Sequence, residues 1–255
     1  MNLLNLGCGL SFHPEWTNVD FTSRAKGVIE HDLMKGLPFA DESFDVVYHS
    51  HLIEHFPKSY TPVFLKECFR VLRHGGIIRI ATPDLEQIAR LYLSLLDKAD
   101  KGDKSAQDKY EWILIELFDQ IVRNKSGGEM LKYWKQNPMP AEDFVINRVG
   151  SEVLNTLHNL RKNNQIPKQE KFTDKPLTIN DPIDIGHFRL SGEVHQWMYD
   201  RFSLKKLLFK TGFNNANICE ANESSIPNFN SYLLDIEPDG SVRKPDSIYV
   251  EARKP

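Results

Sequence analysis

The chain has 255 residues, 40% of them hydrophobic, which is enough for one domain with a full core and an added segment. Its formal net charge of −3 gives no electrostatic reason to expect nucleic acid as a partner. The three cysteines, Cys8, Cys68 and Cys219, have no metal-binding spacing and leave one unpaired, which favours a reducing compartment. The longest apolar run, residues 112–117, is too short to span a bilayer. No signal peptide is visible, so we expect a cytoplasmic protein without membrane insertion.

The first twenty residues predict a strand, a glycine turn and a second strand that ends on a carboxylate. An apolar run at residues 3–6 leads into Gly7-Cys8-Gly9, and Asn18-Val19-Asp20 ends the second strand. The glycines let the backbone approach a ligand that a Cβ would push away, and the acid can accept hydrogen bonds from two ribose hydroxyls. These features indicate half of a nucleoside-binding site. Only ten residues separate Gly9 from Asp20, so we expect the first crossover helix to be one turn around residues 12–16, or missing.

Three more strands and one helix are predicted before residue 85. Residues 28–33, 44–48 and 77–81 have the composition of short buried strands. Between the last two, apolar residues at helical spacing predict a helix that stops at Gly75-Gly76. Gly, Asp, Asp and His-Ser follow successive strands, at the carboxyl ends where open α/β sheets bind their ligands.

The middle of the chain has the pattern of packed helices over residues 85–99, 106–123, 129–135 and 142–162. Most of their apolar stripe is expected to be core and not a ligand pocket. An insertion at this point of the chain lies at the ligand-binding edge of the sheet, so it is predicted to act as a lid and substrate wall. Residues 162–182 read as a polar loop whose lysines form a solvated face.

The last part of the chain returns to the sheet. Ser203 as N-cap and Gly212 as stop predict a helix, and residues 217–220 and 248–251 predict the last two strands. The 25 residues 221–245 between these strands are long for a hairpin. We expect this connection to fold over the surface or over a partner chain, which leaves a homodimer open.

These motifs resemble the class I S-adenosylmethionine-dependent methyltransferases. The resemblance rests on LNLGCG, NVD at 18–20, HDL at 31–33, LPFADESFDVVYHSHLIEHF at 37–56 and FRVLRHGGIIRIATPDL at 69–85, and extends loosely over 187–254. It implies an α/β fold with a doubly wound, mostly parallel sheet, an antiparallel end, and a helical lid inserted after the fifth strand. The cofactor-binding core would comprise residues 1–84 and 187–255, and the insertion residues 85–186. The style is closest to small bacterial methyltransferases associated with sugar or polysaccharide pathways.

The resemblance also implies S-adenosyl-L-methionine as the cofactor. The glycine turn would lie against the methionine part, Asp20 would hold the ribose and Asp32 would face the adenine. No metal ligand is expected. The residues expected to bind the cofactor are Leu6, Gly7, Cys8, Gly9, Asp20, Phe21, Asp32, Leu33, His49 and Ser50.

Catalytic candidates follow from the chemistry of methyl transfer. The reaction needs no covalent enzyme intermediate, so positioning provides most of the acceleration, but an oxygen nucleophile usually needs a general base. By analogy with the family, His51 points toward the methyl group. His195 and Tyr199 could close over the site from the other side, and His187 and Asp84 are further options. We expect a small-molecule or sugar acceptor that is methylated at oxygen.

Three other interpretations stay open. The H-x-x-E-H pattern at residues 51–55 is a metallopeptidase signature in which both histidines bind zinc and Glu54 is the base. It requires a helix and a further acidic ligand, and it gives the glycine turn and Asp32 no purpose. The short first crossover and the lack of a compelling base also fit a non-catalytic cofactor-binding subunit or sensor. An NAD-linked oxidoreductase is disfavoured because the third glycine of its motif is missing.

Overall fold

The computed structural model describes residues 1–23, 25–162 and 181–255, and its contacts divide the chain into two compact units. The first unit comprises Met1–Asp84, Gln196–Val242 and Ser247–Pro255, and the second comprises Leu85–His195 and Arg243–Asp246. The polar loop predicted over 162–182, with Lys168, Lys171 and Lys175, falls almost entirely outside the described residues. Among the helices that the structure describes, none combines the length and the apolar character needed to cross a membrane.

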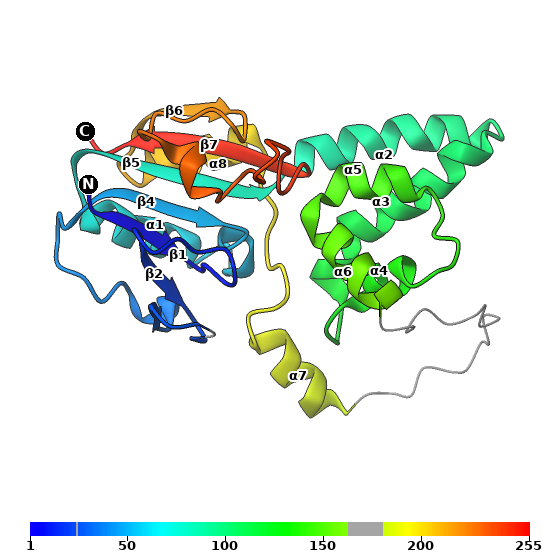
Figure 1. Cartoon of the computed structure of the whole chain (residues 1–255), viewed down its shortest axis with the longest axis horizontal. Helices are drawn as coiled ribbons and strands as arrows, with labels where there is room; N and C mark the ends of the chain where they lie inside the picture. The colour runs from blue at the N-terminus through cyan, green and yellow to red at the C-terminus, as the bar shows by residue number, and fades with distance from the viewer. Residues whose placement is uncertain (24, 163–180) are drawn as a thin grey trace. The chain divides into compact units, whose positions relative to one another are not determined.

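A seven-stranded sheet in the order β3-β2-β1-β4-β5-β7-β6 forms the centre of the first unit (Figure 1). The strands from β3 to β5 are parallel to one another, whereas β7 is antiparallel to both of its neighbours. The predicted mostly parallel sheet with an antiparallel end is therefore confirmed. The strands are β1 (Leu3–Leu6), β2 (Thr17–Asp20), β3 (Val28–Glu30), β4 (Phe44–Ser50), β5 (Leu72–Pro83), β6 (Asn214–Cys219) and β7 (Ser247–Arg253).

One face of this sheet is covered by α1 (Thr61–Val71) and α8 (Arg201–Lys210). Phe64 and Leu65 of α1 and Leu204 and Leu208 of α8 are at most 1% exposed and pack against apolar side chains of the strands. Leu204 and Leu208 are four residues apart, and in α1 the buried Phe64 and Leu65 are followed by the buried Cys68, so each helix presents one apolar stripe to the sheet. Burying a side chain of this size contributes about 1.5–3 kcal/mol, which makes apolar packing the main force on this face.

The opposite face is covered by irregular chain. Trp16, in the link between β1 and β2, packs there with Ile226, Phe229 and Leu234 of the long connection before β7. The β1–β2 link contains no helix, as its length predicted, and the connection folds over the sheet of its own unit. A short 3₁₀ turn, η3 (Phe229–Tyr232), is the regular element of this cover. Trp16 and the connection thus occupy the place that a crossover helix takes in a sheet wound on both faces.

A buried arginine fastens the connection to the sheet. Arg79 of β5 is 0% exposed; its Nε donates to Asp235 Oδ2 at 2.7 Å and its Nη1 donates to Glu251 Oε1 at 2.8 Å. Tyr48 donates to the other oxygen of Asp235 at 2.6 Å, and Arg79 also donates to the carbonyls of Ala221 and Glu223. Because a buried charge is tolerated only when it is paired and hydrogen-bonded, this network holds the cover in one position.

The second unit is helical. Trp112, Ile113, Val145 and Val153 are 0% exposed and form part of its interior. The pattern over 142–162, predicted as one helix, is two helices, because Gly150 has φ 72° and a Cβ there would lie 2.4 Å from a backbone oxygen. The helices are α2 (Leu85–Asp100), α3 (Lys104–Val122), α4 (Gly128–Trp134), α5 (Glu142–Val149), α6 (Ser151–Lys162) and α7 (Pro182–Leu190).

Two helix boundaries in the first unit differ from the sequence prediction. Helix α1 ends at Val71, and β5 begins at the next residue and runs through Gly75-Gly76. The N-cap of α8 is Asp200, which accepts hydrogen bonds from two backbone amides, while Ser203 completes the capping box at the third helical position. Glycine is a common helix stop and serine a common N-cap, but Gly75 and Ser203 each lie a few residues from the actual helix boundary.

Candidate functional site

The glycine turn after β1 is fastened to the end of β2. Gly7 and Gly9 have φ of 64° and 53°, in the left-handed region that favours glycine. The amides of Gly7 and Cys8 donate to the Val19 carbonyl at 2.8 and 3.2 Å. A Cβ on Gly7 would lie 2.8 Å from Leu52, but a Cβ on Gly9 would meet no atom within 4 Å. The turn is therefore packed on one side and open on the other, as a cradle for a ligand requires.

Asp20 is held against this turn. Its Oδ2 accepts a hydrogen bond from the Gly9 amide at 2.7 Å, and its Oδ1 accepts one from the Thr22 amide at 3.2 Å. An ionised carboxylate has about four acceptor positions, so two remain for the hydroxyls of a ligand. Burial, followed by the charge of Asp20, raises the pKa of Cys8 to about 11, so this thiol is protonated at neutral pH.

The residues after β3 are close to Asp20 because β2 and β3 are paired. The His31 amide donates to the Asp20 carbonyl at 2.9 Å, and Asp32 follows directly. Asp32 caps the short turn η1 (Leu33–Lys35) by accepting from the Met34 amide at 3.0 Å. Leu33 is buried in the core, whereas Phe21, the residue after Asp20, is 65% exposed.

The side chain of His49 lies in the core. It is 0% exposed, its ring packs against Phe64 with centroids 5.4 Å apart, and neither ring nitrogen has a hydrogen-bond partner among the described residues. Burial lowers the pKa of His49 to about 3, so the imidazole is neutral. The prediction that His49 binds the cofactor is therefore unsupported for its side chain. Ser50, at the end of β4, is partly exposed, and β4 pairs with β1 up to the residue before the glycine turn.

His51 has a left-handed backbone conformation, and each of its ring nitrogens lies close to another side chain. It is a non-glycine residue with φ 50°, directly after β4, and its amide donates to the Ala81 carbonyl at 2.9 Å. Its Nε2 lies 2.7 Å from Ser247 Oγ, and its Nδ1 lies 3.5 Å from Glu54 Oε1. Left-handed non-glycine residues are strained and are often found at functional sites.

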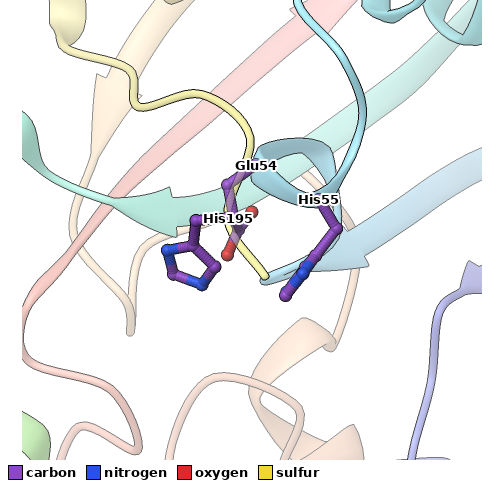
Figure 2. A group of neighbouring side chains, drawn as sticks. All are labelled: Glu54, His55 and His195. Atoms are coloured by element: carbon purple, nitrogen blue, oxygen red, sulfur yellow. The ribbon is translucent and has the colours of Figure 1, made fainter. Parts of the chain in front are cut away.

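Glu54 and His55 lie on the 3₁₀ turn η2 (Ile53–His55), which follows His51 (Figure 2). The Glu54 side chain is 0% exposed, and its Oε2 accepts a hydrogen bond from Thr82 Oγ1 at 3.0 Å. Because η2 is a single short turn, His51 and His55 do not share the helix face that the H-x-x-E-H zinc motif requires. The structure therefore contradicts the helical requirement of the metallopeptidase interpretation.

His195 is drawn in Figure 2 with Glu54 and His55, and donor atoms of the three lie within 4.8 Å of one another. His195 is the last residue of the longer segment of the second unit, and its amide donates to Gln120 within that unit. The other two residues belong to the first unit, so we assign no metal to this group.

The remaining catalytic candidates lie in other surroundings. Tyr199 is 3% exposed, belongs to the core of the first unit, and donates to Thr61 Oγ1 at 3.0 Å. Residues 195–199, which contain both His195 and Tyr199, are not helical. Asp84 forms a bridge with Tyr199, and His187 lies exposed on α7. Tyr199 thus packs in the core of the first unit, and its catalytic role stays a prediction.

Sequence reasoning missed Ser247 and Thr82 and gave Glu54 a role only in the zinc motif. One signal was available for Ser247. Because β7 is antiparallel to β5, the first residue of β7 lies opposite the last residue of β5, at the edge where the parallel strands end.

Comparison with known proteins gives a family match for the first part of the chain. A methyltransferase domain model matches residues 4–80. A probable S-adenosylmethionine-dependent methyltransferase of Mycolicibacterium smegmatis is 43% identical over 56 residues, which is 22% of this chain and 21% of that protein. A probable methyltransferase of Aspergillus luteorubrus is 31% identical over 112 residues, 40% of this chain and 39% of the relative. The chain thus spans well under half of the length of these relatives.

Solved structures resemble the chain weakly. A SAM-dependent methyltransferase from Archaeoglobus fulgidus is 14% identical with a TM-score of 0.41, covering 99% of this chain and 86% of that one. A SAM-dependent methyltransferase from Thermotoga maritima is 14% identical with a TM-score of 0.41, covering 100% of this chain and 82% of that one. The domain match, the strand order and the glycine turn joined to an acid carry the assignment: residues 4–80 form a methyltransferase domain of the class I S-adenosylmethionine-dependent type.

Proposed function

We propose that the whole protein is an S-adenosylmethionine-dependent methyltransferase that methylates an oxygen of a small-molecule or sugar acceptor. The observation that carries the proposal is the hydrogen bond from the Gly9 amide to Asp20 Oδ2, 2.7 Å long, beside a Gly9 Cα that faces open space. A preformed acceptor group next to an open backbone suits a nucleoside, since little has to be ordered when the ligand binds.

The cofactor would be held by three groups of residues. The turn Gly7–Gly9 would lie against its methionine part, Asp20 would accept hydrogen bonds from the ribose hydroxyls, and Asp32 with Phe21 would face the adenine. When bound, the cofactor supplies an electrophilic methyl group on a sulfonium. The exposed ring of Phe21 and the cap position of Asp32 are compatible with these roles.

The chemistry asks little of the protein beyond orientation and removal of one proton. A hydroxyl acceptor has to lose its proton as its oxygen is methylated, and a histidine is the usual group to take it at neutral pH. His51 is our candidate for this base because it follows β4 and its ring is held by Ser247 and Glu54.

A transfer assay tests the proposal. Purified full-length protein would be incubated with methyl-labelled cofactor and with fractionated sugars, other small molecules and proteins. We expect label in a hydroxylated small-molecule or sugar fraction. The label should remain after a treatment that removes methyl groups from nitrogen, because the methyl group is expected on oxygen. Cofactor binding without transfer to any fraction would contradict the proposal and favour a non-catalytic cofactor-binding subunit.

A further inference from the structure

The ring of His51 has a different partner on each nitrogen, and both partners belong to the first unit. Ser247 Oγ is 2.7 Å from Nε2, a full hydrogen bond, and Glu54 Oε1 is 3.5 Å from Nδ1, a contact that becomes an ion pair only when the imidazole is protonated. The imidazole is only 15% exposed, and the carboxylate is fully buried. Electrostatic effects are stronger in such an environment than in water. An ionised Glu54 would therefore influence whether Nδ1 or Nε2 of His51 carries the proton.

One oxygen of the Glu54 carboxylate accepts a hydrogen bond from a side-chain hydroxyl. Thr82 donates its hydroxyl hydrogen to Oε2 at 3.0 Å, so that oxygen acts as an acceptor. The Glu54 carbonyl accepts from the amides of Gln196 and Trp197, which fixes the backbone of η2. A negative charge beside Nδ1 stabilises the proton on that nitrogen, and Nε2 is then left as the basic nitrogen.

Ser247 marks the direction in which this basic nitrogen points. With the proton on Nδ1, Nε2 accepts a hydrogen bond, and the 2.7 Å contact is then a hydroxyl of Ser247 donating to it. A hydroxyl of the chain thus makes the contact that an acceptor hydroxyl would make with a general base. An amine acceptor needs only to arrive deprotonated and would not require this arrangement.

We propose that Glu54 is a positioning residue that holds His51 as the Nδ1-protonated tautomer, so that Nε2, which contacts Ser247 in this structure, is the basic nitrogen that an acceptor hydroxyl would reach by displacing Ser247. This inference rests on the proposed function. In the step it serves, the acceptor oxygen forms a bond to the methyl carbon, the carbon–sulfur bond breaks with its electron pair on sulfur, and the acceptor proton goes to His51 Nε2. The imidazolium then faces the Glu54 carboxylate, and the proton leaves to solvent before the next turnover.

The tautomer of His51 can be observed without any turnover. Long-range proton–nitrogen correlation spectra of the ¹⁵N-histidine-labelled protein distinguish the two neutral tautomers from the cation, and a His51→Ala spectrum identifies the signal of His51. We expect the Nδ1-protonated form in the wild type. In Glu54→Gln, which keeps the shape of the side chain and can still accept from Thr82, we expect the Nε2-protonated form to become populated. The surface variant Glu42→Gln should leave the His51 signal unchanged.

Kinetics of the same variants test the consequence. Glu54→Gln should lower kcat on a hydroxyl acceptor by about 100-fold or more, with KM and cofactor affinity nearly unchanged, because only the state of the base differs. An Nε2-protonated tautomer in the wild type, or an unchanged tautomer in Glu54→Gln, would overturn the proposal. An unchanged kcat in Glu54→Gln would also overturn it. Should Glu54→Gln fail to fold, Ser247→Ala provides the second test, since it should alter the Nε2 signal and leave the proton on Nδ1. If the wild type binds no cofactor, the proposed function fails, and the spectra still report the tautomer independently.

Discussion

The edge of the sheet at which the parallel strands end has two halves. They differ in how far apart in the sequence their contacting residues lie. In the half formed by β1, β2 and β3, the glycine turn and Asp20 lie within one short segment of chain, and 11 positions separate the two residues joined by the Gly9–Asp20 hydrogen bond. In the half formed by β4, β5 and β7, the contact between His51 and Ser247 joins residues 196 positions apart. The first half is therefore a local motif, and the second exists only once the sheet is assembled.

The largest effect is expected at Arg79, which fastens the connection before β7 to the sheet. Arg79→Met removes the positive charge and leaves Asp235 and Glu251 buried without it. We expect the free energy of unfolding to fall by about 3–5 kcal/mol, because breaking a buried ion pair strands an uncompensated charge. Urea unfolding measures this change, and Arg90→Met, at an exposed pair with Glu86, is the matched control with a change under about 1 kcal/mol. Equal loss in both variants would show that the network does not hold the connection.

The next effect separates the two halves by function. His51→Ala should lower kcat on a hydroxyl acceptor by about 100-fold, or about 2.7 kcal/mol, while leaving cofactor affinity nearly unchanged. Turnover and calorimetric binding, measured on the same preparation, provide the two readouts. His74→Ala, at a mostly exposed histidine near the start of β5, serves as control. Unchanged turnover in His51→Ala would remove this residue from the mechanism.

In the half formed by β1, β2 and β3, we expect a substitution to weaken cofactor binding. Asp20→Ala removes the acceptor held by the Gly9 and Thr22 amides, and we expect cofactor affinity to weaken by about 1–3 kcal/mol. Calorimetry of the variant checks this, with Asp41→Ala, at an exposed residue paired with Arg70, as control. An unaltered affinity would mean that the ribose is held elsewhere.

The last effect depends on pH and concerns His49 of β4, whose side chain is buried beside Phe64. Burial lowers its pKa to about 3, so the unfolded chain binds a proton more readily than the folded chain below the usual value of 6.5. Stability should therefore fall with decreasing pH, by about 1.4 kcal/mol per pH unit from this group between about pH 6 and pH 4. Denaturation of wild type and His49→Leu across this range isolates the contribution. Parallel pH profiles of the two proteins would show that the imidazole is not buried neutral.

The local half and most of the fold could be predicted from the sequence. Glycines before a carboxylate, apolar strands and the short β1–β2 link each leave a signal within a few residues, and each prediction agrees with the structure. The distant half could be predicted only in part. His51 follows a predictable strand, but Ser247 and Thr82 come near it through strand pairing, and no short motif records that pairing.

The burial of the Tyr199 and His49 side chains could not be predicted for a related reason. Both are residue types that serve catalysis or packing equally well, and only burial distinguishes the two uses. Tyr199 is 3% exposed and His49 is 0% exposed. Position in the sequence indicated that they lie near the strand ends, but it carried no information on whether their side chains face the ligand or the core.

The central claim is that the strand ends of the first unit bind an adenosyl cofactor, and calorimetric titration of the folded full-length protein with the demethylated product S-adenosylhomocysteine tests it most directly. We predict one binding site per chain for this nucleoside and a weaker one in Asp20→Ala. A folded wild-type protein with no measurable affinity for either the product or S-adenosylmethionine would contradict the account.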